Sequence, residues 1–284
     1  MVGYQPSYLF LVKEESKMSS NLVKLGKDAL GKRMKDNYET IPKTRLMRRT
    51  PVAIRIDGKA FHTFTRGFKR PFDDVLANSM YNTLAYLCKN IQGCVFGYTQ
   101  SDEITLILCD YQTLTTDAWF DYEVQKMCSI SASMATMIFN KEFSKAVDNV
   151  TIDIDNEEDD TKYINTLIRA KEKGAMFDSR CFNIPKEEVT NLIYWRQLDA
   201  TRNSIQMVGQ ANFSHKQLQH KSCNEIQDML YVQKGINWDD TPTKYKRGVA
   251  CFKDESGWRL DYEMPIIKGE DRDYVERHIH FEEE

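Results

Sequence analysis

The order of apolar and polar positions between residues 52 and 108 predicts a strand, a helix and a hairpin. Residues 52–58 begin with a β-branched apolar run and end in Asp-Gly, the pattern of a buried strand that enters a turn. Residues 73–90 carry apolar side chains at helical spacing, and in residues 96–108 two apolar runs flank a polar turn. This βαββ order predicts an α/β (α+β) fold with a mixed sheet and helices on at least one face.

The remaining pattern predicts five more regular elements and two irregular segments. We expect helices over residues 22–37, 121–143 and 187–210, and strands over 175–184, which Pro185 ends, and 247–253. The segment 63–72 mixes aromatic, basic and turn-forming residues and is expected to be a loop. Residues 148–160 are acidic and almost free of apolar side chains, so they are expected to form an exposed loop or insertion.

Composition places the chain among ordinary globular proteins. Of its 284 residues 41% are hydrophobic and 29% charged, and no apolar run approaches the roughly 18 residues of a membrane span. Residues 8–12 form an apolar stretch that is too short for a secretory signal, so an intracellular, cytoplasmic protein is expected, with a mitochondrial one as the alternative. The seven cysteines form no CxxC pair, which favours buried thiols over zinc ligands or disulfides.

Net charge gives little indication of the partner. A formal charge of −3 does not point to nucleic acid, but basic clusters at residues 43–49, 66–70 and 244–247 offer local contacts for phosphate. A cluster of this kind is more often a solvated face, so the charge pattern leaves RNA binding open.

Candidate chemistry gathers at two acidic turns, Asp57-Gly58 and Asp102-Glu103. If their strands are neighbours, the carboxylates converge, and ligands that offer only oxygen suit Mg²⁺ better than zinc. Two Mg²⁺ bridged by a carboxylate are one means of phosphoryl transfer, and Gly58 would let the backbone approach metal or phosphate. The plain alternative is a turn dipeptide and a solvated hairpin tip.

Five motifs, taken in order, favour a functional site at the acidic turns over that plain alternative. Together they resemble the tRNA-His guanylyltransferases, the polymerases that add nucleotides in the 3′-to-5′ direction. The motifs are Arg55-Ile56-Asp57-Gly58-Lys59-Ala60-Phe61-His62-Thr63-Phe64, Tyr98-Thr99-Gln100-Ser101-Asp102-Glu103, Phe177-Asp178-Ser179-Arg180, Trp195-Arg196-Gln197-Leu198-Asp199 and Tyr245-Lys246-Arg247-Gly248. They span about residues 25 to 255, and it is their order rather than any single motif that makes the resemblance specific.

The resemblance implies a palm-like mixed or antiparallel sheet with a helical C-terminal or fingers part, assembled as a homotetramer. It implies a 1–20 extension, a 21–147 catalytic palm domain, and a 148–284 family region with RNA-contacting helices. In such enzymes ATP or GTP activates a 5′-monophosphorylated tRNA end. The 3′-hydroxyl of an incoming nucleoside triphosphate then attacks that activated phosphate, with two Mg²⁺ at the site.

Site residues follow from the same resemblance, position by position. The implied catalytic acids are Asp57, Asp102 and Glu103, with Asp57, Asp102 and the Gly58 carbonyl as metal ligands. The implied nucleotide contacts are Asp57, Gly58, Lys59, Ala60, Phe61, His62, Ser101, Asp102 and Lys126, and the weaker RNA contacts are Arg180, Arg196, Asn203, Lys246 and Arg247. Without the resemblance, a lone histidine such as His62 beside Phe61 and Phe64 would more often be structural. Arg180 is equally open to an internal ion pair with Asp178.

Two departures from the family pattern bear on the substrate. Where eukaryotic tRNA-His enzymes have His-Ile-Asn-Asn-Leu-Tyr-Asn, this chain has Thr201-Arg202-Asn203-Ser204-Ile205-Gln206-Met207. It therefore looks more like the guanylyltransferase-like branch, which repairs truncated tRNA 5′ ends by templated addition. Glu123 stands where the guanylyltransferases often have arginine, which leaves open how that helix contacts a triphosphate.

Three alternatives accompany the repair hypothesis. One is a tRNA-His guanylyltransferase that adds a single G. A second is a palm-type nucleotide cyclase, which would share the paired acids but would not need Trp195-Arg196-Gln197 or the basic segments. The third is an RNA-binding module with a decayed site, against which the intact Asp57, Asp102 and Lys126 argue.

Overall fold

The computed structural model describes residues 29–151 and 157–281 of the chain. The chain divides into two compact units, Met1–Thr44 and Arg45–Glu284. In the first unit, α2 (Gly31–Met34) continues into a π-helical turn, Lys35–Glu39, which confirms the predicted helix for its described part. The expected extension over residues 1–20 lies outside the described residues.

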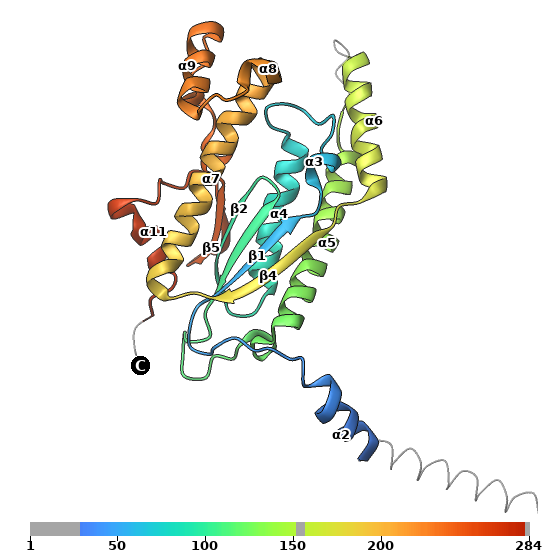
Figure 1. Ribbon diagram of the computed structural model, residues 1–284, viewed down its shortest axis with the longest axis vertical. Helices are drawn as coiled ribbons and strands as arrows, with labels where there is room; N and C mark the ends of the chain where they lie inside the picture. Colours follow the sequence, from blue (N-terminus) through green and yellow to red (C-terminus); the bar gives the residue numbers. More distant parts are fainter. Residues whose placement is uncertain (1–28, 152–156, 282–284) are drawn as a thin grey trace, which may run out of the picture. The chain divides into compact units, whose positions relative to one another are not determined.

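A six-stranded sheet forms the centre of the second unit, in the order β4-β1-β3-β2-β5-β6 (Figure 1). Its strands are β1 (Val52–Gly58), β2 (Cys94–Gln100), β3 (Glu103–Leu108), β4 (Phe177–Asn183), β5 (Val249–Asp254) and β6 (Gly257–Asp261). The predicted strand and hairpin are confirmed, as are the strands in 175–184 and 247–253. All five described pairings are antiparallel, which confirms the antiparallel form of the expected palm-like sheet and not the mixed one. Strand β1 pairs with β3, which runs opposite to it, and not with β2.

Two long helices cover one face of the sheet, α4 (Asp74–Asn90) and α5 (Val124–Asp148), as Figure 1 shows. Asp73 caps the N-terminus of α4, and its side chain accepts a hydrogen bond from the Leu76 amide at 3.1 Å. Helix α5 packs against β4 through small side chains, with the hydroxyls of Ser131 and Ser179 2.7 Å apart. Alternate residues of β1, Val52, Ile54 and Ile56, are buried in this layer of the core.

The opposite face of the sheet is covered by α7 (Lys186–Asn212), which was predicted as a helix over 187–210, and by α11 (Asp273–Glu276). Val275 and Ile279 of the charged C-terminal region are fully buried in this second layer. Beyond the sheet, α7 continues into a small cluster with α8 (His215–Leu218) and α9 (Cys223–Lys234). The shorter elements are α3 (Phe61–Phe64), Trp119–Tyr122, Trp238–Asp240, α10 (Thr243–Arg247) and Gly269–Arg272. The expected helical C-terminal part is therefore present.

Two segments differ from their prediction. The last residues of the acidic stretch begin α6 (Glu157–Lys173), because Leu167 and Ala170 farther along pack into the core and hold the helix in place. Residues 152–156 lie outside the description. The expected loop at 63–72 is preceded and partly replaced by α3, whose Phe61 and Phe64 are buried one helical turn apart.

Two expectations from composition concern the cysteines and the membrane. All seven cysteines are free thiols; four are buried, as predicted, and three are partly exposed. None of the described helices has both the length and the apolar character that crossing a bilayer requires.

Candidate active site

The two acidic turns lie side by side at one end of the sheet. Asp57, near the end of β1, is the register partner of Glu103 at the start of β3. The backbone N–H of Gly58 donates to the Asp102 carbonyl at 3.1 Å, which joins the end of β1 directly to the hairpin. The structure thus brings together Asp57, Gly58 and Asp102, the residues expected to bind metal.

Only glycine fits at position 58. A Cβ there would lie 2.2 Å from the ring of Phe61, far inside van der Waals contact. That ring is fixed in the core by Phe139 and Phe177, at centroid separations of 5.6 and 5.1 Å. The chain turns at Ala60, which has φ 55°, into α3, so the backbone after Asp57 stays tightly folded beside the carboxylates.

Crowding and burial raise the pKa of both aspartates. Burial, with smaller contributions from the charges of Asp57 and Glu103, raises the pKa of Asp102 to about 6, although the Ser101 hydroxyl partly opposes the shift. Burial, then the charges of Glu103 and Asp178, raises the pKa of Asp57. This concentration of negative charge is what a bound cation would relieve.

The donor set fits magnesium shared with a phosphate ligand. Nowhere in residues 29–151 and 157–281 do three or more His, Cys, Asp or Glu side chains form a group that could hold a metal ion by themselves. Two carboxylates and the Gly58 carbonyl are oxygen donors, and Mg²⁺ is commonly held by one or two carboxylates plus substrate phosphates and water. Asp57, Gly58 and Asp102 therefore suit a cation that arrives with a nucleotide.

Glu103 lies in a different environment from the two aspartates. It is 7% exposed, and its carboxylate accepts hydrogen bonds from Nη2 of Arg55 and Nη2 of Arg196, each at 2.8 Å. Arg196, on α7, also pairs with Asp199 at 2.8 Å. Glu103 therefore connects β3 to β1 and α7, and in this structure its position suits holding the hairpin rather than contacting a substrate.

A cleft of about 690 Å³ opens beside the aspartates. Its cationic wall comes from the segment after α3, where Arg66, Lys69 and Arg70 are exposed, and the exposed His62 of α3 lies beside them in the lining. Asp73 fixes this segment, because its carboxylate accepts from the Lys69 amide at 3.0 Å and from the Tyr163 hydroxyl at 2.8 Å. A cleft of this size, acidic on one wall and basic on the other, suits a nucleoside triphosphate with a cation.

Most of the expected nucleotide contacts line this cleft. They are Asp57, Gly58, Ala60, Phe61, His62, Ser101 and Asp102. Lys59 and Lys126 are not among its lining residues, and Lys126 is 56% exposed and 4.0 Å from the Glu123 carboxylate. Glu123 therefore faces the lysine that the resemblance assigned to triphosphate. Met207 and Gln210 of α7 line the cleft without having been predicted. Their spacing of four and seven residues from Asn203 would have placed them on the same helical face.

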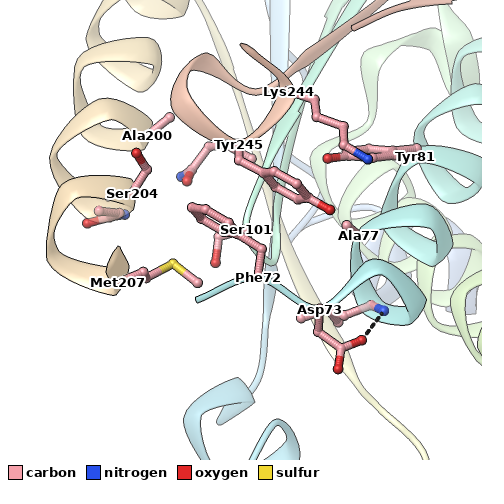
Figure 2. Close-up of a pocket in the computed structure, with 13 residues that line it drawn as sticks. Phe72, Asp73, Ala77, Tyr81, Ser101, Ala200, Ser204, Met207, Lys244 and Tyr245 are labelled. Atoms are coloured by element: carbon pink, nitrogen blue, oxygen red, sulfur yellow. Dashed lines mark hydrogen bonds between the residues drawn. The ribbon is translucent and has the colours of Figure 1, made fainter. Parts of the chain in front are cut away.

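A smaller cavity of about 80 Å³ adjoins the cleft. Figure 2 shows Ala200, Ser204 and Met207 along α7 on one side of it, with Phe72 and Tyr245 opposite. The two rings stack at a centroid distance of 4.3 Å, and the Tyr245 hydroxyl bonds to Asp74. Ser101 lines both hollows, so the cavity extends the active-site cleft toward α7 and α10.

The expected RNA contacts are placed unevenly. Arg180 is exposed and pairs with Asp178 at 2.8 Å, and Asn203 lines the small cavity. Arg196 and Lys246 are 5% and 6% exposed, and Lys246 pairs with Asp239. Arg247 is half-buried, and its carbonyl accepts from the Tyr98 hydroxyl at 2.6 Å. Burial and pairing leave little of Arg196 or Lys246 for a phosphate.

Comparison with known proteins agrees with this geometry. The family model described as "Thg1: tRNAHis guanylyltransferase" matches residues 31–185. A bacterial tRNA(His) guanylyltransferase (Thg1)-like protein, solved in complex with ATP, is 41% identical with a TM-score of 0.77 over 89% of this chain and 100% of its own. A second such bacterial structure, in complex with GTP, is 38% identical with a TM-score of 0.70, again over 89% of this chain and 100% of its own.

More distant relatives point the same way. The tRNA(His) guanylyltransferase of Saccharomyces cerevisiae is 25% identical over 213 residues, which are 69% of this chain and 80% of that protein. The matched model covers more than half of the chain, and the two bacterial structures share its fold. The nucleotide cyclase and non-catalytic alternatives are thereby set aside. The chain belongs to the tRNA-His guanylyltransferase (Thg1) family, and it is a 3′-to-5′ nucleotidyltransferase similar to the bacterial Thg1-like proteins.

Proposed function

We propose that this enzyme activates a 5′-monophosphorylated tRNA end with ATP or GTP and then adds template-matched nucleotides to it. One observation supports the proposal above the others. Asp57 and Asp102 meet beside a cleft of about 690 Å³ whose other wall carries Arg66, Lys69 and Arg70. ATP and GTP are proposed as ligands because related bacterial proteins were solved in complex with them.

Asp57, Asp102 and the Gly58 carbonyl would hold magnesium in this proposal. Magnesium bound there would supply positive charge to the phosphate under attack and to the leaving group. The basic segment binds the phosphate chain, and its attachment to Asp73 keeps these cations on the wall opposite the acids. Two bond exchanges follow: an oxygen of the tRNA 5′-phosphate displaces pyrophosphate from the activating nucleotide, and the 3′-hydroxyl of the next nucleotide then displaces the nucleoside monophosphate.

The ion pairs around Glu103 serve orientation in this scheme. Because Glu103 is held by arginines from β1 and α7, the hairpin tip that bears Asp102 has a fixed position relative to Asp57. Positions fixed before the substrate arrives reduce the entropy lost on reaching the transition state. Glu103 is accordingly proposed as a positioning residue rather than a proton carrier.

Residues of α7 are the reason to propose repair of truncated tRNA rather than addition of a single G to tRNA-His. Ser204 and Met207, which stand where the eukaryotic tRNA-His pattern has asparagine, border the small cavity beside the cleft. Different residues at this border are expected to give a different RNA preference. The proposal includes the homotetramer that the family resemblance implies and the cytoplasmic location that was expected from the sequence.

An incorporation assay tests the proposal. A set of 5′-monophosphorylated tRNAs, each lacking its first nucleotide, is incubated with ATP, Mg²⁺ and labelled nucleotides. Template-matched incorporation into several tRNAs is expected, and a single G added only to tRNA-His would overturn the repair assignment. Asp57→Ala and Asp102→Ala should abolish incorporation, whereas Asp228→Ala, at an exposed site on α9, should leave it unchanged.

A further inference from the structure

A second cleft of about 550 Å³ lies at the far end of α7. Its walls come from the last turns of α7, from α8 and the segment after it, from α9 and from Arg70. The residues that line it are Arg70, Gln206, Gln210, Phe213, Ser214, His215, Leu218, Gln219, Lys221 and Ile226. The chain contains 42 Asp and Glu residues, yet none of these described lining residues is acidic. A cleft with cations and no carboxylate suits an anionic ligand.

This second cleft continues the active-site cleft, because Arg70 and Gln210 line both. Along α7, Asn203, Met207 and Gln210 are spaced as neighbours on one helical face. They border in turn the small cavity, the active-site cleft and, at Gln210, the second cleft. One face of α7 therefore follows a continuous path of hollows that passes Asp57 and Asp102.

The donors in the second cleft fit a phosphodiester chain. The side chains of Gln206, Gln210 and Gln219 are exposed, and an amide both donates to phosphate oxygens and accepts from a 2′-hydroxyl. Arg70 is exposed and has no ion-pair partner among the described residues, so its charge is available to a ligand. Lys221 pairs with Glu225 at 2.8 Å and contributes less.

The same cleft is poorly suited to a free nucleotide. Phe213 is 8% exposed and so offers little surface on which a base could stack, which leaves the exposed His215 as the one accessible ring among the lining residues in the described part of the chain. A triphosphate usually brings a divalent cation, which prefers carboxylate oxygens, and the lining residues that the structure describes supply none.

We propose that the second cleft binds the phosphodiester backbone of the substrate RNA next to its 5′ end, and so directs that end into the active-site cleft. This inference rests on the proposed function, and it assigns to α7 and α8 a contact that depends on RNA backbone rather than on base sequence. Of the three hollows, Gln206 and Gln219 line only the second cleft. Substitutions at these two residues therefore test the second cleft without altering the lining of the active-site cleft.

Single carboxylates placed in the cleft test the proposal. Gln206→Glu and Gln219→Glu are compared with Gln233→Glu, an equal charge change at an exposed site on α9. Binding of a 3′-fluorescein-labelled, 5′-monophosphorylated acceptor-stem RNA is measured by anisotropy, together with the affinity for MgATP and the melting temperature. Each cleft variant is expected to raise the Kd for RNA about tenfold, with the affinity for MgATP unchanged. Gln206→Lys should instead tighten RNA binding and steepen its salt dependence.

The outcomes separate this inference from the function on which it rests. If the wild-type protein extends truncated tRNA but both cleft variants bind RNA like Gln233→Glu, the second cleft has no role in RNA binding and only the inference fails. Weakened MgATP binding with unchanged RNA binding would also overturn it, by making the cleft a nucleotide site. If the wild-type protein neither binds nor extends RNA, the proposed function fails as well.

Discussion

Removal of Arg196 should destabilise the protein far more than removal of an arginine six residues farther along α7. In Arg196→Met the buried Glu103 carboxylate loses the partner at 2.8 Å on α7 and keeps Arg55 on β1. The side chains of Arg196 and Glu103 are 6% and 9% exposed, so water cannot replace the lost hydrogen bonds.

The magnitude follows from that burial. Breaking a buried pair costs about 3–5 kcal/mol, and because Glu103 keeps Arg55 we expect about 3 kcal/mol for Arg196→Met. In a domain of this size such a loss lowers Tm by roughly 6–12 °C. Arg202 also pairs with Asp199 but is 60% exposed, so Arg202→Met should cost less than about 1 kcal/mol.

The assay is urea unfolding followed by circular dichroism, with Tm measured in parallel. Equal stabilities of Arg196→Met and Arg202→Met would refute the argument that the Glu103 network holds the sheet to α7. Incorporation adds a second readout. If Glu103 positions the hairpin, Arg196→Met should lower kcat at temperatures where it is folded, with little change in KM for ATP.

Three further predictions concern the aspartates and the turn between them. Because the pKa of Asp102 is raised to about 6, the folded state binds its proton more tightly than the unfolded state, so Asp102→Asn should be more stable than wild type above pH 6. That advantage, followed as Tm without metal, should shrink as pH falls from 6 toward 4, and a constant difference would contradict the pKa assignment. Gly58→Ala should lower stability by roughly 1–3 kcal/mol and abolish incorporation, because the new methyl overlaps the Phe61 ring; normal turnover would contradict the close packing. Asp73→Ala should lower the free energy of unfolding by about 1–2 kcal/mol, because α4 loses its cap, and raise KM for ATP, because the basic segment loses its attachment. Lower stability with an unchanged KM would mean that Asp73 caps the helix but does not position the basic segment.

The sequence predicted best those elements in which the spacing of apolar residues matches the positions that are buried in the fold. β1 and the hairpin alternate between two buried faces and end in turn residues, so their type and neighbourhood followed from pattern alone. The antiparallel pairing did not follow, because a βαββ order does not say which strand of the hairpin lies beside the first. The start of α6 was missed because its stability comes from core contacts made later in the helix.

Within the site, the acids could be predicted and their partners could not. Asp57 and Asp102 sit in turns that sequence makes visible, but whether Glu103 faces the cleft or the interior depends on tertiary contacts. A signal existed for Arg196: Val189, Ile193 and Ala200 are buried at helical spacing, and Arg196 falls on the same stripe. The basic clusters gave no such signal, because periodicity does not distinguish Lys246, which is buried, from Arg70, which is exposed.

The hydrogen bond between the Gly58 amide and the Asp102 carbonyl allows one amide proton to report whether the two acidic turns are joined. This bond at 3.1 Å is the backbone link between the end of β1 and the hairpin turn. Its amide exchanges with deuterium only when that link opens, and the rate of exchange measures the free energy of opening. Slow exchange at Gly58 in the free protein would mean that the two aspartates are held together before any nucleotide or metal arrives. Slowing that appears only on adding MgATP would mean that the ligand completes the assembly.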